Sequence, residues 1–219
     1  MKHQGNLWEG SRKMKVILVN GSPNKAGCTY TALTEIEKVL VEEGIETEIF
    51  HIGTEPLAGC IGCGVCRENK RCFRNDSVNK CVEKAESADG FIFGSPVHYA
   101  SASGAIISFM DRAFYGKKDI FKNKPAAAVV SLRRGGATAS MDQLNKYFSI
   151  SCMPIVSSQY WNMVHGNKPE EVLQDLEGLQ TMRTLGRNMA WLLKSIECGK
   201  KAGLGLPVQE TPVATNFIR

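Results

Sequence analysis

Short apolar runs alternate with longer amphipathic segments along most of the chain. Residues 16–19, Val-Ile-Leu-Val, are continuously apolar and are followed by Asn-Gly, which is typical of a parallel strand buried on both faces. Four later segments are also short, rich in apolar residues and bounded by polar or small ones. We therefore expect strands at residues 14–23, 46–52, 90–96, 125–132 and 153–161.

The intervals between the expected strands have helical periodicity. In the first interval Leu33, Ile36 and Leu40 recur every three or four residues, and Gly44 supplies a stop. The last apolar pattern begins at Pro169, which suits the first turn of one long amphipathic helix. Helices are expected at residues 30–44, 77–89, 101–115, 137–150 and 169–198.

Strands that alternate with helices predict an α/β fold, a doubly wound parallel sheet with helices on both faces and right-handed crossovers. A chain of 219 residues fits one domain with a sizeable core. We assign residues 14–200 to this domain, including a Cys-rich loop at 57–76. Residues 1–13 are expected to be a flexible extension, and residues 201–219 a C-terminal arm.

Net charge and composition limit the classes of partner that the protein is expected to bind. The net charge of +5 is mild and no block of five basic residues is present, so no nucleic-acid partner is expected. No apolar run reaches the length of a membrane span, and residues 1–13 lack the apolar core of a signal peptide. We expect a cytoplasmic protein without a membrane partner, and there clustered cysteines are more often metal or redox sites than structural disulfides.

Three loops follow expected strand ends, where open parallel sheets bind ligands. Residues 21–29 run into a helix with small residues and hydroxyls, so backbone N–H groups and the helix N-terminus favour a phosphate. The loop lacks the Walker ending and the three-glycine dinucleotide pattern, and a plain turn with a helix cap is the alternative. Residues 94–104 suit the edge of a flat heteroaromatic ring, and the glycines of residues 131–138 permit close backbone approach.

Two of these loops carry a family resemblance. NGSPNKAGCT, residues 20–29, resembles the phosphate loop of the flavodoxin-like NAD(P)H-dependent FMN reductases, and GSPVHYASASGAIISFMDR, residues 94–112, resembles their isoalloxazine loop and following helix. The resemblance covers residues 14–200. It implies a five-stranded sheet in the order 2-1-3-4-5, FMN at the switch point of that order, and a homodimer or homotetramer with the flavins near an interface.

The resemblance also implies which residues contact FMN. The phosphate contacts carried over by position are Ser22, Asn24, Gly27, Cys28 and Thr29. The ring contacts are Pro96, Val97, His98 and Tyr99, and the third loop adds Ser131, Arg133, Gly135 and Gly136. Asn24 stands where the family commonly has arginine, and Cys28 where it has asparagine or serine. Backbone amides and the nearby Lys25 are therefore expected to contribute more of the phosphate binding.

Four of the eight cysteines lie within thirteen residues, as Cys60, Cys63, Cys66 and Cys72. Three thiols at this spacing suit one face of a 4Fe-4S cluster, with Cys72 as the fourth ligand. The resemblance extends here to the iron–sulfur flavoproteins, which have such a cluster segment beside the flavin. A zinc site, a regulated disulfide and free thiols are the alternatives; zinc is disfavoured because structural sites usually pair two distant Cys-x2-Cys units.

The basic side chains near the cysteines allow two interpretations. The cysteines are surrounded by Arg67, Lys70, Arg71 and Arg74. These cations could lower thiol pKa values and offset the charge of a cluster, or they could form a solvated basic loop.

Five further residues are candidates for a role in or near the site. His98 could hydrogen-bond the flavin or donate a proton to a substrate, or it could simply be packed. Trp161 and His165 could wall a substrate pocket beside a partner subunit's flavin, or pack in a core or interface. Asp111-Arg112 is expected to be an ion pair within a helix.

The function that these features favour is an FMN-dependent NAD(P)H oxidoreductase with a small-molecule acceptor, such as a quinone, a flavin, or a nitro or azo compound. Hydride transfer to N5 of FMN needs no acid, base or nucleophile, so no catalytic side chain is assigned. An electron carrier between protein partners, with ferredoxin as a candidate, is one alternative. A thiol or metal sensor is another.

Overall fold

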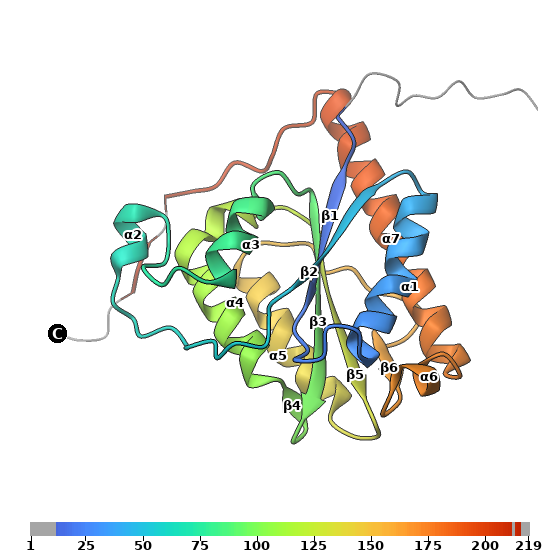
Figure 1. The fold of residues 1–219 in the computed structure, drawn as a ribbon. Coiled ribbons are helices and arrows are strands. Elements are labelled where there is room, and N and C mark those ends of the chain that lie inside the picture. The colour runs from blue at the N-terminus through green and yellow to red at the C-terminus, as the bar shows by residue number, and fades with distance from the viewer. Residues whose placement is uncertain (1–11, 212, 216–219) are drawn as a thin grey trace, which may run out of the picture.

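Five parallel strands form the sheet in the order β2-β1-β3-β5-β6 (Figure 1). The computed structural model describes residues 12–211 and 213–215. The parallel strands are β1 Lys15–Asn20, β2 Glu46–His51, β3 Gly90–His98, β5 Ala126–Leu132 and β6 Met163–His165. A short strand, β4 Ser101–Ala102, pairs antiparallel with the end of β3. Without β4 the order is the expected 2-1-3-4-5, which confirms the predicted fold.

Helices cover both faces of this sheet (Figure 1). On one face lie α1 Cys28–Glu42, α6 Pro169–Val172 and α7 Leu176–Lys201; on the other lie α3 Ser77–Ala85, α4 Gly104–Lys117 and α5 Ala137–Ile150. The five-residue α2 Val65–Asn69 lies outside these layers beside α4, and the 3-10 turn η1 Lys118–Ile120 follows α4. No helix in the described ranges is both long enough and apolar enough to cross a bilayer.

The core consists of two apolar layers, one on each face of the sheet. Along β1, Ile17 and Val19 belong to the layer beneath α3, α4 and α5, while Val16 and Leu18 belong to the layer beneath α1 and α7. All four side chains are fully buried. A continuous apolar run is required for this two-sided burial, which confirms the interpretation of residues 16–19.

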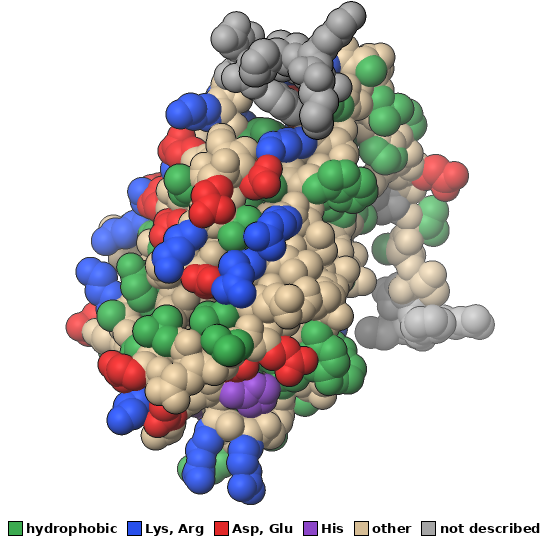
Figure 2. Space-filling model, turned by 90° about the vertical axis from the view of Figure 1, so that its right-hand side faces the viewer, with side chains coloured by type: hydrophobic (Ala, Val, Ile, Leu, Met, Phe, Trp, Pro, Cys, Tyr) green, Lys and Arg blue, Asp and Glu red, His purple; other side chains and the backbone are tan. Residues whose placement is uncertain are grey.

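The outer face of α1 and α7 carries intermixed charges (Figure 2). Glu35 on α1 pairs with Arg183 on α7 at 2.6 Å, and Lys194 pairs with Glu43 at 2.5 Å. Acidic and basic side chains thus alternate on this face, and no basic stripe forms on it.

The fifth expected strand was placed wrongly. Within 153–161 the chain pairs with the sheet only at a single bridge between Ile155 and Ala126, whose hydrogen bonds are made by Pro154 and Val156. The chain then leaves the sheet because α7 binds it: Asn188 donates to the carbonyl of Ser157 at 2.8 Å, and Thr184 donates to Gln159 at 2.6 Å. The chain rejoins the edge of the sheet as β6. The single strand predicted at residues 153–161 is therefore replaced by one bridge and a later, shorter strand.

The last expected helix is two helices. The α6 helix ends at Val172, and Asp175 caps α7 by accepting from the backbone N–H of Gly178 at 2.9 Å. The other oxygen of Asp175 accepts from the backbone N–H of His165 at 2.6 Å. Asp175 therefore breaks the predicted helix and ties the break to the end of β6.

The ends of the chain extend beyond the sheet. Arg12 pairs with Asp89 at 2.6 Å, while the rest of the expected extension, residues 1–11, lies outside the described residues. Residues 204–211 and 213–215 form no helix or strand and are exposed. The proposed domain boundaries stay predictions.

Candidate functional site

The first loop is shaped by its own side chains at the carboxyl end of β1. The buried Asn20 accepts from the backbone N–H of Ser22 and donates to the carbonyl of Lys25, both at 3.1 Å. The hydroxyl of Ser22 accepts from the backbone N–H of Asn24 at 3.1 Å. His51, at the end of β2, contacts the carbonyl of Ser22 at 2.8 Å. The turn is therefore set before any ligand is present.

This turn leaves an anion-binding helix end open. The α1 helix begins at Cys28 with Gly27 at its N-cap, and no side chain caps it. The N–H groups of its first turn therefore point outward with the positive end of the helix dipole. A cavity of about 410 Å³ opens there, lined by residues 24–28 and 167–169. Phosphate fits this combination of unpaired N–H groups and open space.

Two residues predicted to contact the cofactor, Thr29 and Ser131, are hydrogen-bonded to each other and do not line that cavity. The hydroxyls of Thr29 and Ser131 are 2.8 Å apart, and both residues are buried. Cys28 lies at the cavity wall, with its thiol 3.6 Å from the carbonyl of Gly166. Burial raises the pKa of the Cys28 thiol, so the neutral S–H form prevails near neutral pH.

The second loop is a tight hairpin. Val97 pairs with Ala102 and His98 with Ser101, so Tyr99 and Ala100 form the turn. Both turn residues have positive φ, 50° and 60°. This backbone matches the right-handed twist of a hairpin but costs energy for side chains other than glycine. It leaves the Tyr99 side chain fully exposed at the tip.

Contacts between the loops join them into one site. Gly21 donates to the carbonyl of Gly94 at 2.8 Å, and Ser103 donates through its hydroxyl to the carbonyl of Gly21 at 3.1 Å. The third loop supports the hairpin through Gly136, where a Cβ would lie 2.4 Å from the Cα of Ala100. The predicted loops therefore converge at the lower edge of the sheet in Figure 1. Arg133 and Gly135 are exposed there. The contact roles of all these residues stay predictions.

The four cysteines of the quartet, Cys60, Cys63, Cys66 and Cys72, line one cavity together with Arg112 and Tyr115. All four are free thiols. Among the described residues no three His, Cys, Asp or Glu side chains stand in the arrangement of a bound metal ion. The quartet therefore gathers around a shared space without forming a finished ion site.

The quartet is far from the hairpin of the same chain. The hairpin precedes α4 at Ser103, whereas Cys66 and Arg67 contact Tyr115 near the other end of that helix. Twelve residues of α-helix span roughly 18 Å. Within one chain the quartet therefore lies at the opposite end of α4 from the hairpin, because the loop after β2 runs along α4 away from the strand ends (Figure 1). The expectation that the quartet lies beside the flavin stays a prediction.

Cys72 is the most constrained member of the quartet. Its thiol accepts from both Nε and Nη2 of Arg112 at 3.4 Å. Arg112 also forms two hydrogen bonds with Asp76, at 2.6 and 2.9 Å. Burial opposes the charge of Arg112, but the hydrogen bonds to Asp76 and Cys72 outweigh it and the pKa of the guanidinium is raised.

The predicted ion pair between Asp111 and Arg112 does not form. Neighbours on a helix point in different directions: Arg112 turns to Asp76, while Asp111 accepts from the hydroxyl of Tyr147. Burial raises the pKa of Tyr147, and the Asp111 contact raises it further.

The cations around the quartet have local partners. Arg71 bonds Asn75 at 2.9 Å and Glu83 at 3.3 Å, while Arg67 donates to the hydroxyl of Tyr115 at 3.0 Å. Arg74 lies over the Phe73 ring at 5.0 Å.

The remaining candidates lie at the edges of the site. His98 is exposed at the end of β3, and His165 lies 3.4 Å from Asp175. Trp161 is half exposed and packs edge-on against Tyr160. Sequence reasoning missed Asp76 and Asn79, since neither lies in a motif and their partners are distant or on another element.

Comparisons with known proteins identify the family of the chain. The profile of the family described as NADPH-dependent FMN reductase matches residues 14–168. An iron-sulfur flavoprotein of Methanocaldococcus jannaschii is 34% identical over 192 residues, covering 84% of this chain and 100% of that protein. An FMN-dependent NADPH-azoreductase of Staphylococcus saprophyticus is 30% identical over 117 residues, covering 53% of this chain and 59% of the relative.

A solved structure extends the likeness of fold. RosB, crystallised with a riboflavin-5'-phosphate derivative, superposes with a TM-score of 0.67 at 15% identity and covers 94% of each chain. The sequence matches over most of the domain, with the loops that converge at the switch point, show that this chain belongs to the NADPH-dependent FMN reductase family of flavin oxidoreductases.

Proposed function

We propose that the protein is an FMN-dependent NAD(P)H oxidoreductase that passes electrons through bound FMN to a small-molecule acceptor. The observation that carries this proposal is the uncapped start of α1, open to a cavity at the end of β1. Quinones, free flavins, and nitro or azo compounds are the acceptor classes. The azoreductase relative supports the last class.

The residues of the site bind and orient the cofactor. The backbone N–H groups of Lys25, Ala26 and Cys28 would hold the phosphate, since those of Asn24 and Gly27 are bonded within the loop, and Lys25 would add a positive charge beside them. The Thr29–Ser131 hydrogen bond fixes the first loop to the third, and the hairpin of Val97 to Ala102 presents backbone groups to the ring edge. Bound FMN supplies the electron chemistry, accepting two electrons from a nicotinamide and passing them on.

The quartet is proposed to hold a 4Fe-4S cluster. Thiolates are the usual ligands of such clusters, and the four thiols line one cavity. The iron-sulfur flavoprotein relative supports the assignment. Zinc would need a tighter tetrahedral set of sulfurs.

An electron carrier between proteins is the second candidate. The exposed quartet segment favours it, because Ile61 and Phe73 present apolar surface among basic side chains there. Apolar surface with a basic rim suits an acidic redox partner. The carrier differs from the oxidoreductase in drawing electrons from a protein donor.

Anaerobic reduction distinguishes the two candidates. Protein loaded with FMN should lose its flavin absorbance within the time of mixing with NADPH or NADH, and a quinone or azo dye should restore it. Reduction only by a reduced ferredoxin would contradict the oxidoreductase and support the carrier. A protein that takes up no FMN would contradict both.

A further inference from the structure

Arg112 is the only buried Lys, Arg, Asp or Glu in the part of the chain that the structure describes. Its side chain is 1% exposed. A buried cation is costly unless it is paired and its N–H groups are hydrogen-bonded. Asp76 supplies the pairing, with both carboxylate oxygens bound at 2.6 and 2.9 Å. The question is what the other N–H groups bind.

The other N–H groups of Arg112 bind both ends of the cysteine segment, residues 58–74. Nε and Nη2 donate to the thiol of Cys72, each at 3.4 Å. Nη1 donates to the carbonyl of Ala58 at 3.3 Å, and Nη2 to that of Arg74 at 3.4 Å. One side chain of α4 therefore ties the start of the segment to its end.

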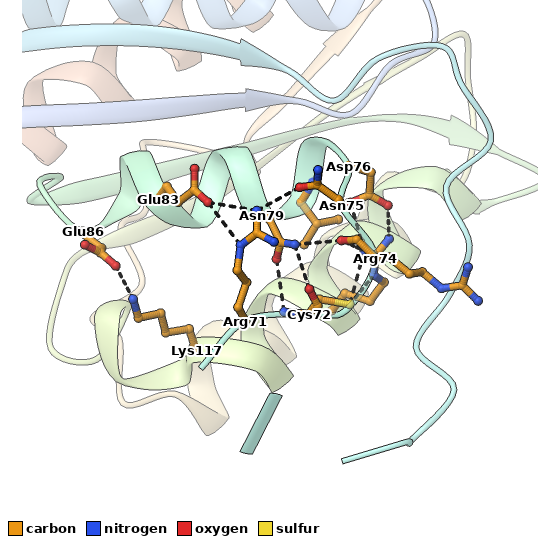
Figure 3. A network of polar contacts seen from close by, with 11 residues as sticks. Arg71, Cys72, Arg74, Asn75, Asp76, Asn79, Glu83, Glu86 and Lys117 are labelled. Atoms are coloured by element: carbon orange, nitrogen blue, oxygen red, sulfur yellow. Dashed lines mark hydrogen bonds and ion pairs between the residues drawn. The ribbon is translucent and has the colours of Figure 1, made fainter. Parts of the chain in front are cut away.

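A buried amide fixes the same cysteine from the other side. Asn79, on α3, is 2% exposed. Its Oδ1 accepts from the backbone N–H of Cys72 at 3.2 Å, and its Nδ2 donates to the carbonyls of Cys72 and Arg74 at 2.9 and 2.8 Å. Figure 3 shows Cys72 enclosed by this network, with Asn79 and Asp76 beside it.

The rest of the quartet has no comparable support. Cys60 and Cys63 are exposed, and within the described residues no hydrogen bond fixes their thiols. Gly62 and Gly64, on either side of Cys63, have positive φ. The contact of Cys66 with the carbonyl of Tyr115 is long, at 3.9 Å. The quartet thus combines one thiol held by side-chain hydrogen bonds with three whose thiols have long contacts or none among the described residues.

We propose that Arg112 and Asn79 are positioning residues that hold Cys72 as the preformed ligand of the cluster. Asn79 fixes its backbone, and Arg112 orients its sulfur and offsets the negative charge of a thiolate-ligated cluster. This inference rests on the proposed function, because it takes the quartet to be the cluster site. Hydrogen bonds and charge next to cluster sulfurs set both retention and reduction potential.

The test compares variants of the anaerobically reconstituted holoprotein. Arg112→Met removes the guanidinium, Asn79→Ala removes the backbone clamp without changing charge, and Arg112→Lys keeps the charge but not the fork. Arg71→Met is the matched control, because it removes a cation next to Cys72 whose side-chain hydrogen bonds, within the described residues, go to Asn75 and Glu83. Iron release to a chelator, the cluster midpoint potential and FMN content are measured on each.

We expect Arg112→Met to release iron roughly 10- to 100-fold faster, the range typical of lost outer-shell partners, and to lower the midpoint potential. Asn79→Ala should speed release with a smaller change in potential. Arg71→Met should leave both readouts close to those of the unmodified protein. If Arg112→Met fails to fold, Arg112→Lys carries the test and should also release iron faster than the control.

Equal iron-release rates and midpoint potentials for the Arg112 variants and Arg71→Met would overturn this inference and leave the proposed function unaffected. An unmodified protein that binds FMN but takes up no iron would instead contradict the cluster in the proposed function, and the inference with it. The FMN content separates a local effect on the quartet from a general loss of structure.

Discussion

The phosphate loop and the cysteine segment are built in opposite ways. The loop after β1 is shaped by residues within a few positions of one another, such as Asn20, Ser22 and Asn24. The cysteine segment is held by Arg112 and Asn79, which belong to helices packed against it. A site made of local turns and helix ends is visible in a sequence, whereas one held by distant side chains is not.

The largest expected effect concerns the cysteine segment. Asp76→Ala should lower the free energy of unfolding by about 3 kcal/mol, because it leaves the buried Arg112 without its partner. Glu83→Ala is the control. It breaks the exposed pair with Arg71 and should cost less than about 1 kcal/mol. Urea denaturation measures the free energy of unfolding of both variants. Equal losses would contradict the stabilising role of the buried Arg112–Asp76 pair.

The contact between hairpin and third loop comes next. Gly136→Val places a side chain against the Ala100 backbone at a positive φ, 94°. We expect a loss of about 2 kcal/mol in unfolding free energy and weaker FMN binding. Gly205→Ala, outside the predicted cofactor loops and at a position where an added Cβ meets nothing within 4 Å, should change neither quantity much. Similar FMN affinities in the two variants would contradict a role of the hairpin in binding the flavin.

The smallest effects concern Cys28. Cys28→Ser replaces a weak S–H donor with a hydroxyl at the cavity wall, so FMN affinity should rise roughly threefold, within the worth of one hydrogen bond. Cys152→Ser, outside the predicted cofactor loops, is the control. Weaker binding by Cys28→Ser would show that the thiol is a required contact.

The thiol of Cys28 also has a pH signature. Burial raises its pKa, so less thiolate is present at a given pH than in an unfolded peptide. Mass-resolved alkylation of Cys28 in the folded protein should therefore reach half its maximum rate at a higher pH than in the denatured chain. A midpoint at or below that of the denatured chain would contradict the burial of this side chain.

Much of the fold could be predicted from sequence because its signals are local. The run at 16–19 was sufficient for β1, and the loop of small and polar residues after it was sufficient for the turn that leads into α1. The errors arose where distant groups compete with local pattern: Asn188 and Thr184 draw residues 157–159 out of the sheet, and Asp175 breaks the last helix.

The same limit applied to the site itself. The sequence pattern predicts that Arg112 pairs with its neighbour Asp111. The true partner, Asp76, lies 36 positions away, and only the packing of α3 against α4 brings it near. Periodicity placed both helices but did not identify which of their polar side chains meet.

Ligand discrimination by the apoprotein tests the phosphate site most directly. Isothermal titration should show FMN binding roughly 100-fold or more tightly than riboflavin, since two charge-assisted hydrogen bonds from the loop would each contribute about 1.5–3 kcal/mol. Added inorganic phosphate should weaken FMN binding and leave riboflavin binding unchanged. Equal affinities for FMN and riboflavin, with no effect of phosphate, would contradict the assignment of residues 24–28 to the phosphate.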